Sequence, residues 1–408
     1  MAARPAPWLE LRTLLLLGLA FGFAYLDRMA ITFLSPYVVK DLHLDNTQMG
    51  ALGSALSITW ALGAYFIGRW SDRRGARKPF LLAALLVFSG CSLLSGLARS
   101  YAALFAARAV MGAVEGPFLP ICLAIITAVT VQERRGLNAG IAQNVFGSIL
   151  GTALAPVVLV YVADRLGWHA AFYASGIPGL ILAVLIWRFI PEPPRVAPAA
   201  DASHDSAFSM LANRNIALCA GISCMMVGSM VTGSIYLPLY FTEVRGLTPA
   251  TMAWIMFVLG FCPAVGGVLV PWLSDRIGRR PPMIVFCALL ALCPLAALYI
   301  RGPLPLMTAL MFVGWLGAGT FPLFMGIVPA EALAFRSAAA AMGLVVAVGE
   351  LTGGVFSPLL GGWAADRFTL AAPLLLQAVL PLLAMVLALG LRETNPRRTQ
   401  MSPARVQA

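Results

Sequence analysis

The feature that most constrains this chain is a series of apolar runs, each about 20 residues or longer, that repeats along its whole length. A helix needs about 20 mostly apolar residues to cross the hydrocarbon core of a bilayer. Twelve runs meet that length, and short polar loops separate them. The pattern predicts a protein that crosses the membrane twelve times.

The composition agrees with that reading. Of the 408 residues, 60% are hydrophobic and only 11% are charged, whereas soluble domains carry about 25% charged residues. A soluble fold or a disordered chain is therefore excluded, and the lipid bilayer becomes the expected surroundings. The seven cysteines and three histidines are scattered, which predicts no disulfide framework, no metal site and no cofactor.

We expect an all-α membrane protein whose twelve helices form two pseudo-symmetric six-helix bundles. The expected spans are 11–37, 47–70, 80–97, 101–130, 136–163, 170–190, 216–242, 251–273, 283–300, 304–330, 337–364 and 370–391.

The loops differ in charge on the two sides of the membrane. With twelve spans, one side collects 20 of the 28 lysines and arginines and the other side collects six. Because Lys and Arg concentrate in cytoplasmic loops, we expect both termini in the cytoplasm. The net charge of +11 then reflects membrane topology and not binding to nucleic acid.

The two halves of the chain resemble each other. The stretch Gly68–Gly75 (GRWSDRRG) recurs as Pro271–Gly278 (PWLSDRIG), and Ala163-Asp164-Arg165 recurs 202 residues later. Such a repeat is typical of transporters that expose a central site alternately to each side. The expected parts are residues 1–190 (first bundle), 191–213 (a Pro- and Ala-rich cytoplasmic linker) and 214–408 (second bundle).

Charged residues inside the spans are expensive and usually functional. Asp27 and Arg28 lie in the first span, Arg108 and Glu115 lie in the fourth, and Glu350 lies in the eleventh. The positions equivalent to the first four, 202 residues later, are uncharged. We therefore expect the first half to carry the ion chemistry.

Arginine holds a carboxylate through two parallel hydrogen bonds, and a carboxyl group in dry surroundings can take up a proton. This combination predicts binding of an organic anion by Arg28 and Arg108, with Asp27, Glu115 and Glu350 as proton sites. The alternatives are a structural ion pair or helix packing, a proton-relay role for Arg108, and contact with a substrate amine for Glu350.

Further candidates fall into two groups. Polar and aromatic residues inside the spans are possible pocket liners: Gln143, Asn144, Trp60, Tyr236, Tyr240 and Trp315. Charged residues at cytoplasmic helix ends are candidates for an inner gate, where carboxylates near helix ends meet arginines: Asp72, Arg73, Asp275, Arg276, Glu133 and Arg134.

Two segments carry a family resemblance. Gly68–Lys78 resembles the signature G-x-x-x-D-R-x-G-x-[RK]-[RK] of the major facilitator superfamily, and Arg108–Gly112 resembles its second motif. The resemblance covers essentially the whole chain. It implies a transporter of the two-bundle fold and no enzyme activity.

Three further strings narrow the resemblance to the anion:cation symporter branch: Tyr25–Arg28 (YLDR), Gly112–Pro120 (GAVEGPFLP) and Gly167–Phe172 (GWHAAF). That branch implies proton-coupled carriage of a small carboxylate, such as a sugar acid or an aromatic acid, by a monomer in the bacterial inner membrane. A Spinster-like lipid carrier, suggested by Glu192–Arg195 (EPPR), and a proton-driven drug exporter are the alternatives.

Overall fold

The computed structural model describes residues 7–74, 76–192, 207–332 and 335–395. Within these ranges, twelve helical stretches are long and apolar enough to cross a membrane, from Trp8–Leu42 to Ala371–Leu389. The predicted all-α class and the predicted number of spans are confirmed. The protein is an integral, multi-pass membrane protein.

The chain forms two compact units. Unit 1 holds the described residues up to 192 together with Ile235–Phe261, and unit 2 holds the described parts of Ala199–Ser234 and Cys262–Ala408. The residues from Ile235 to Phe261 cluster with unit 1 because α11 (Pro249–Leu259) packs against α7 (Ala155–Leu166) and η2 (Ile141–Leu154). The division at 191–213 that the repeat predicts stays a prediction.

In unit 1, segments marked η have 3₁₀ or π-helical hydrogen bonding. The elements are α1 (Pro7–Leu42), α2 (Asn46–Arg74), α3 (Lys78–Leu97), α4 (Tyr101–Glu115), α5 (Phe118–Val129), η1 (Gln132–Arg134), α6 (Arg135–Gly140), η2 (Ile141–Leu154), α7 (Ala155–Leu166), α8 (Trp168–Phe189), η3 (Tyr240–Val244) and α11 (Pro249–Leu259).

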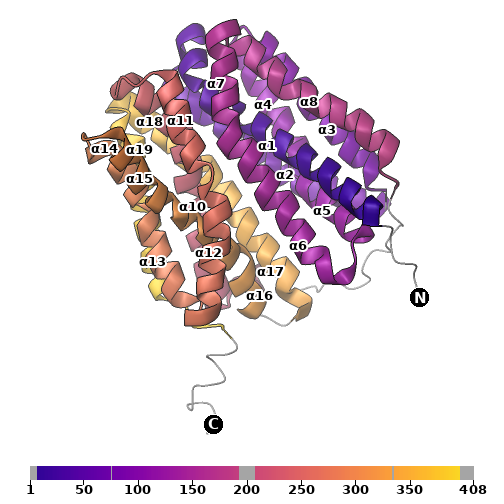
Figure 1. Ribbon diagram of the computed structural model, residues 1–408. Helices are drawn as coiled ribbons and strands as arrows, with labels where there is room; N and C mark the ends of the chain where they lie inside the picture. The colour runs from indigo at the N-terminus through magenta and orange to yellow at the C-terminus, as the bar shows by residue number, and fades with distance from the viewer. Residues whose placement is uncertain (1–6, 75, 193–206, 333–334, 396–408) are drawn as a thin grey trace. The chain divides into compact units, whose positions relative to one another are not determined.

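Unit 2 is also made of helices with short 3₁₀ or π-helical segments between them (Figure 1). Its elements are α9 (Ala207–Leu211), most of α10 (Arg214–Leu239), α12 (Cys262–Ile277), α13 (Arg280–Leu290), α14 (Leu292–Tyr299), α15 (Leu304–Trp315), η4 (Leu316–Thr320), η5 (Leu323–Ile327), α16 (Val328–Ala332), α17 (Phe335–Val348), η6 (Gly349–Gly353), α18 (Gly354–Arg367) and α19 (Ala371–Leu389).

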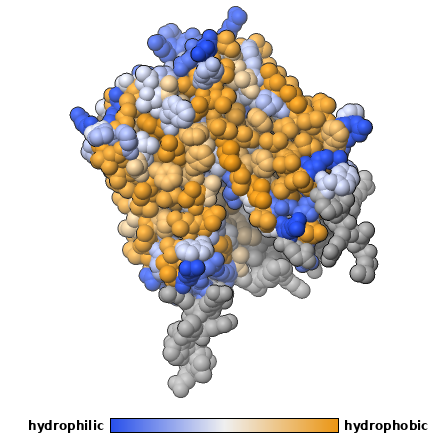
Figure 2. Space-filling view, in the orientation of Figure 1, coloured by the Kyte–Doolittle hydropathy of each residue, from blue (hydrophilic) through white to orange (hydrophobic). Residues whose placement is uncertain are grey.

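Each unit has its own apolar core. In unit 1, Leu17, Leu85, Phe88 and Ile125 are among the buried residues of one cluster, and α1 packs against η2 and α8 while α3 packs against α8. Apolar side chains also cover the outer faces of the helices, and hydrophilic residues gather near the helix ends (Figure 2). This is the distribution expected when lipid surrounds the helices.

The predicted fourth span is confirmed as Tyr101–Val129, but the helix is interrupted within it. It breaks after Glu115, because Gly116 and Pro117 separate α4 from α5. Proline lacks a backbone N–H and clashes with the preceding turn, so a helix tends to end or kink there. The break leaves Glu115 at the end of α4.

Candidate functional site

Four charged residues meet inside unit 1, and we call them the charged cluster: Asp27, Arg28, Arg108 and Glu115. The first two lie in the middle of α1 and the last two lie on α4. Ser100 caps the start of α4 through a hydrogen bond from the Ala103 N–H to its Oγ, at 3.3 Å. Arg108 and Glu115 lie about two turns apart on that helix, so both reach toward α1.

Arg28 and Glu115 form an ion pair in which Arg28 Nη1 lies 3.4 Å from Glu115 Oε1. The two side chains are only 17% and 9% exposed. Arg108, which is buried, donates from Nη2 to the backbone oxygen of Arg28 at 2.8 Å. Arg108 on α4 therefore contacts the same turn of α1 that carries Arg28.

Asp27 lies in different surroundings from Arg28. Adjacent residues on a helix point about 100° apart, and the fully buried carboxyl group of Asp27 meets α3 and α8. Ser175 donates to Asp27 Oδ1 at 2.8 Å, and Ser92 donates to the same oxygen. Arg108 and Glu115 lie close enough to act on it electrostatically.

The charged cluster has unused hydrogen-bonding capacity. Asp27 Oδ2, Arg108 Nε and Glu115 Oε2 are buried and have no hydrogen-bond partner among the described residues. Most buried polar atoms in proteins do have partners. The cluster can therefore accept protons at its carboxyl groups and an oxyanion at its guanidinium groups.

The other predicted pocket residues of unit 1 differ in their position and exposure. Trp60 lies beside the break after Glu115, since a Cβ at Gly116 would come within 2.2 Å of its backbone oxygen. Gln143 and Asn144 are exposed on η2, and within the described chain neither has a hydrogen bond to the charged cluster. Tyr236 and Tyr240 are buried, and the Tyr236 hydroxyl donates to the Asn46 backbone oxygen at 3.1 Å.

The two remaining candidates of this kind lie in unit 2. Trp315 is buried at the end of α15. Glu350 is half-buried in the π-helical segment η6. Single π-helical turns inside α-helices are frequent at functional sites.

The candidate gate residues lie at the end of each unit where most arginines gather. We call these the basic ends. Asp275 and Glu331 both pair with Arg279, and Glu331 Oε1 lies 2.8 Å from Arg279 Nη2. Arg276 stacks on Trp272 at 3.9 Å. Arg73 and Arg134 are exposed. The side chains of Asp72 and Glu133 lie outside the described residues.

Sequence reasoning missed two glutamates that occupy equivalent places at these ends. Glu192, after α8, accepts hydrogen bonds from the backbone N–H groups of Arg77 (2.6 Å) and Lys78 (3.1 Å) at the start of α3. Glu393, after α19, accepts them from Arg279 (2.7 Å) and Arg280 (3.2 Å) at the start of α13. The acidic residue after the last helix of each half was the available signal.

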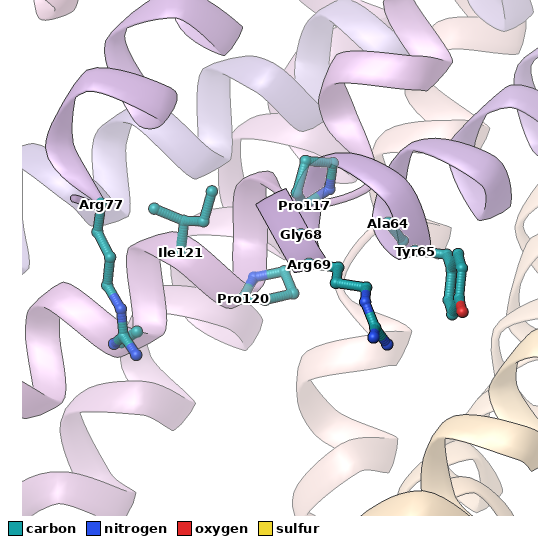
Figure 3. A pocket seen from close by; sticks show the side chains of 9 residues that line it. Ala64, Tyr65, Gly68, Arg69, Arg77, Pro117, Pro120 and Ile121 are labelled. Atoms are coloured by element: carbon teal, nitrogen blue, oxygen red, sulfur yellow. The ribbon is translucent and has the colours of Figure 1, made fainter. Parts of the chain in front are cut away.

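A pocket of about 460 Å³ lies between α2 and α5 (Figure 3). Its walls include Ala64, Gly68, Pro117 and Pro120, and the guanidinium groups of Arg69 and Arg77 lie along it. No predicted pocket residue lines it. It lies toward the basic end of unit 1 and is separate from the charged cluster.

Two six-helix repeats with charged side chains held inside the spans define the class of a polytopic membrane transporter. The comparisons with known proteins give the family. The chain belongs to the Major Facilitator Superfamily, whose model matches residues 17–330 and 218–407.

Similar proteins include transporters of organic acids. The chain is 30% identical over 313 residues to a probable 4-methylmuconolactone transporter of Cupriavidus pinatubonensis, covering 72% of this chain and 70% of the relative. It is 27% identical over 440 residues to a gallate transporter of Pseudomonas putida, covering 97% and 94%. These relatives match the anion:cation symporter-like branch, and they are transporters, not enzymes.

A solved structure supports the fold. A bacterial homolog of the human lysosomal transporter Spinster aligns with a TM-score of 0.76 at 18% identity, covering 94% of this chain and 95% of that one. At this identity the likeness concerns the fold alone.

Proposed function

We propose that this protein carries a small organic anion together with protons across the bacterial inner membrane by alternating access. The observation that carries the proposal is the Arg28–Glu115 pair with Arg108 beside it, inside unit 1. Relatives named as transporters of gallate and hexuronate support a carboxylate cargo.

The charges of the cluster suggest how cargo and proton are coupled. Two arginines and two carboxylates sum to zero net charge. A proton on Glu115 removes the negative charge that faces Arg28 Nη1 and leaves the cluster with one excess positive charge. A substrate carboxylate would then restore neutrality, and an arginine fork suits its geometry. Deprotonation of Glu115 would compete for Arg28 and release the cargo.

The remaining sequence predictions belong to the same proposal. Gln143, Asn144, Trp60, Tyr236, Tyr240 and Trp315 are proposed pocket residues, and Glu350 is a proposed second-unit proton site. The charged residues at the basic ends are proposed to latch the gate. We propose that these ends and both termini face the cytoplasm and that the protein works as a monomer.

The test uses purified protein in liposomes. Gallate, glucuronate and 3-(3-hydroxyphenyl)propionate are screened for thermal stabilisation at pH 5.5 and 7.5, and the best stabiliser is used as labelled substrate under an inward proton gradient. We expect accumulation together with acidification of the lumen. The Glu115→Gln variant should still exchange substrate across the membrane but should no longer accumulate it.

Three results would overturn the proposal. One is stabilisation by lysolipids or lipophilic cations with none by the three acids. Another is uptake that leaves the lumenal pH unchanged. The third is accumulation against a gradient by the Glu115→Gln protein, which would remove the assignment of Glu115.

A further inference from the structure

Asp27 presents a problem of access. Its carboxyl group is fully buried, and it accepts hydrogen bonds from Ser92 on α3 and Ser175 on α8. Arg28, the next residue, reaches α4 through Glu115. A proton on its way to Asp27 therefore arrives most directly between α3 and α8, on a different side of α1 from the Arg28–Glu115 pair.

The α3–α8 interface is lined with hydroxyl groups. Ser89, Ser92 and Ser95 follow one another at three-residue spacing on α3, and all three are fully buried. Glycines on α8 allow this contact, since a Cβ at Gly179 would lie 2.1 Å from Ser89 Oγ. Residues spaced in this way lie about 5–6 Å apart on a helix, a gap that one bridging water can span.

The interface leads to the end of unit 1 opposite the basic end. Five residues separate Ser92 from the end of α3 at Leu97, or about 7.5 Å, whereas 14 residues separate it from the start at Lys78, or about 21 Å. Beyond Ser95, the backbone oxygen of Gly96 accepts hydrogen bonds from Tyr173 Oη at 2.9 Å and from His169 Nδ1 at 2.8 Å.

His169 stands where this interface meets the surface. A carbonyl only accepts hydrogen bonds, so Nδ1 carries a proton and the second proton of an imidazolium is taken by Nε2. That atom lies 3.8 Å from Asp41 Oδ2, and the two side chains are 42% and 55% exposed. The ring also stacks on Trp168. With Nδ1 on the Gly96 carbonyl and Nε2 toward the exposed Asp41 carboxylate, the ring connects the surface to the interface.

We propose that protons reach Asp27 from the end opposite the basic end, along the α3–α8 interface. His169 and Asp41 would stand at its mouth, and Ser92 and Ser175 at its inner end. The organic anion would meet Arg28 and Arg108 on the other side of α1. The inference rests on the proposed proton coupling and adds a separate route for the proton.

The proton balance is simple. Each serine hydroxyl accepts a proton at a lone pair and donates its own proton onward, so it ends unchanged, and Asp27 becomes a neutral carboxylic acid. The charged or titratable groups that face Asp27 are Arg108 and Glu115 from α4 and Cys91 from α3. His169 faces Asp41 from α1.

The test compares two modes of transport in liposomes, with gallate as substrate, or glucuronate if gallate is not carried. We expect the Ser92→Ala/Ser175→Ala protein to lose proton-driven uptake by about tenfold while exchange at equal pH stays within about twofold. Ser92→Thr, which keeps a hydroxyl, should retain the uptake. Ser89→Ala is the matched control, because Ser89 shares the helix face but lies beyond Ser92 from the mouth and does not hydrogen-bond to Asp27.

A second measurement tests whether protons enter from the end of unit 1 where His169 lies. His169→Cys is treated with a bulky, membrane-impermeant thiol reagent applied from outside. We expect proton-driven uptake, already lowered by loss of the imidazole, to fall further on treatment while exchange persists. The same reagent should leave the unsubstituted protein unchanged because its cysteines lie inside the spans.

Each other outcome counts against the route. Unchanged proton-driven uptake in the double alanine variant would overturn it. Loss of exchange along with uptake would show that the serines support the site's structure instead. If the unmodified protein transports without moving protons, the proposed function itself fails, and that result is visible before any variant is made.

Discussion

The contact between α1 and α8 in unit 1 has an equivalent in unit 2, between α10 and α19. In unit 1, Ser175 donates to Asp27. In unit 2, the residues 202 positions later make the corresponding contact, because Ser229 Oγ donates to the backbone oxygen of Gln377 at 2.8 Å. The same pair of positions touches in both units.

The difference between these contacts is one of charge. Both sites are fully buried, but only unit 1 places a carboxyl group there. Burying a charge is costly, and Ser229 shows that a hydroxyl group satisfies the same packing position. The carboxyl group of Asp27 is therefore not needed to join the helices. Its presence in one unit alone is what a chemical role requires.

Removing the positive charge of Arg28 should have the largest effect on transport. We expect Arg28→Ala to abolish both uptake and substrate binding, because the fork that faces Glu115 is lost. Met230→Ala, at the equivalent position of unit 2, should leave both nearly unchanged. Uptake and isothermal binding titration measure the two effects. Equal losses in both variants would contradict the assignment of the charge chemistry to unit 1.

The next effect concerns Asp27 itself. We expect Asp27→Asn to stop accumulation and to spare exchange, because the amide keeps the serine contacts but cannot take up a proton. Ser229→Ala serves as the paired control and should retain both activities. Accumulation is measured by uptake assays and exchange by counterflow assays, on both variants in parallel. Full accumulation by the Asp27→Asn protein would exclude this residue as a proton site.

A smaller effect is expected at the basic ends. Burial acts to raise the pKa of Glu393, but the backbone N–H groups of Arg279, Asn395, Arg280 and Thr394 outweigh it and hold the pKa below its ordinary value. A lowered pKa means that Glu393 stabilises the folded state above its ordinary pKa of about 4.3. That contribution disappears as the pH falls through the depressed folded-state value.

We therefore expect Glu393→Gln to lose about 1–2 kcal/mol at pH 7, measured by thermal unfolding. The loss should shrink as the pH falls below about 4.3. Glu192→Gln should lose less, since Glu192 accepts from only two backbone N–H groups within the described chain. A larger loss in Glu192→Gln than in Glu393→Gln, or a loss that does not depend on pH, would contradict the capping of α3 and α13 by these glutamates.

The smallest effect is expected at the paired gate residues. Asp275→Asn should change stability by less than about 0.5 kcal/mol, because Glu331 still holds Arg279 and Asp275 is exposed. Asp72→Asn, at the equivalent position of unit 1, should slow transport with little change in binding affinity. Uptake rates and binding constants test the pair. Lost binding in Asp72→Asn would assign that residue to the pocket instead.

The sequence predicted the spans well and the contacts poorly. Apolar runs report lipid crossing directly, so the twelve helices could be located. The break after Glu115 was missed, although Gly116-Pro117 signals it. One sequence contains no information on which helices touch, and Arg28 and Glu115 are 87 residues apart. The spacing of Ser89, Ser92 and Ser95 was a readable signal for a polar face on α3.

The caps formed by Glu192 and Glu393 have a mechanical consequence. Each ties the chain leaving a bundle's last helix to the amino end of that bundle's third helix. A pull on the segment after residue 192 is then borne by α3 as well as α8, and the terminal turn of α8 is protected from unravelling.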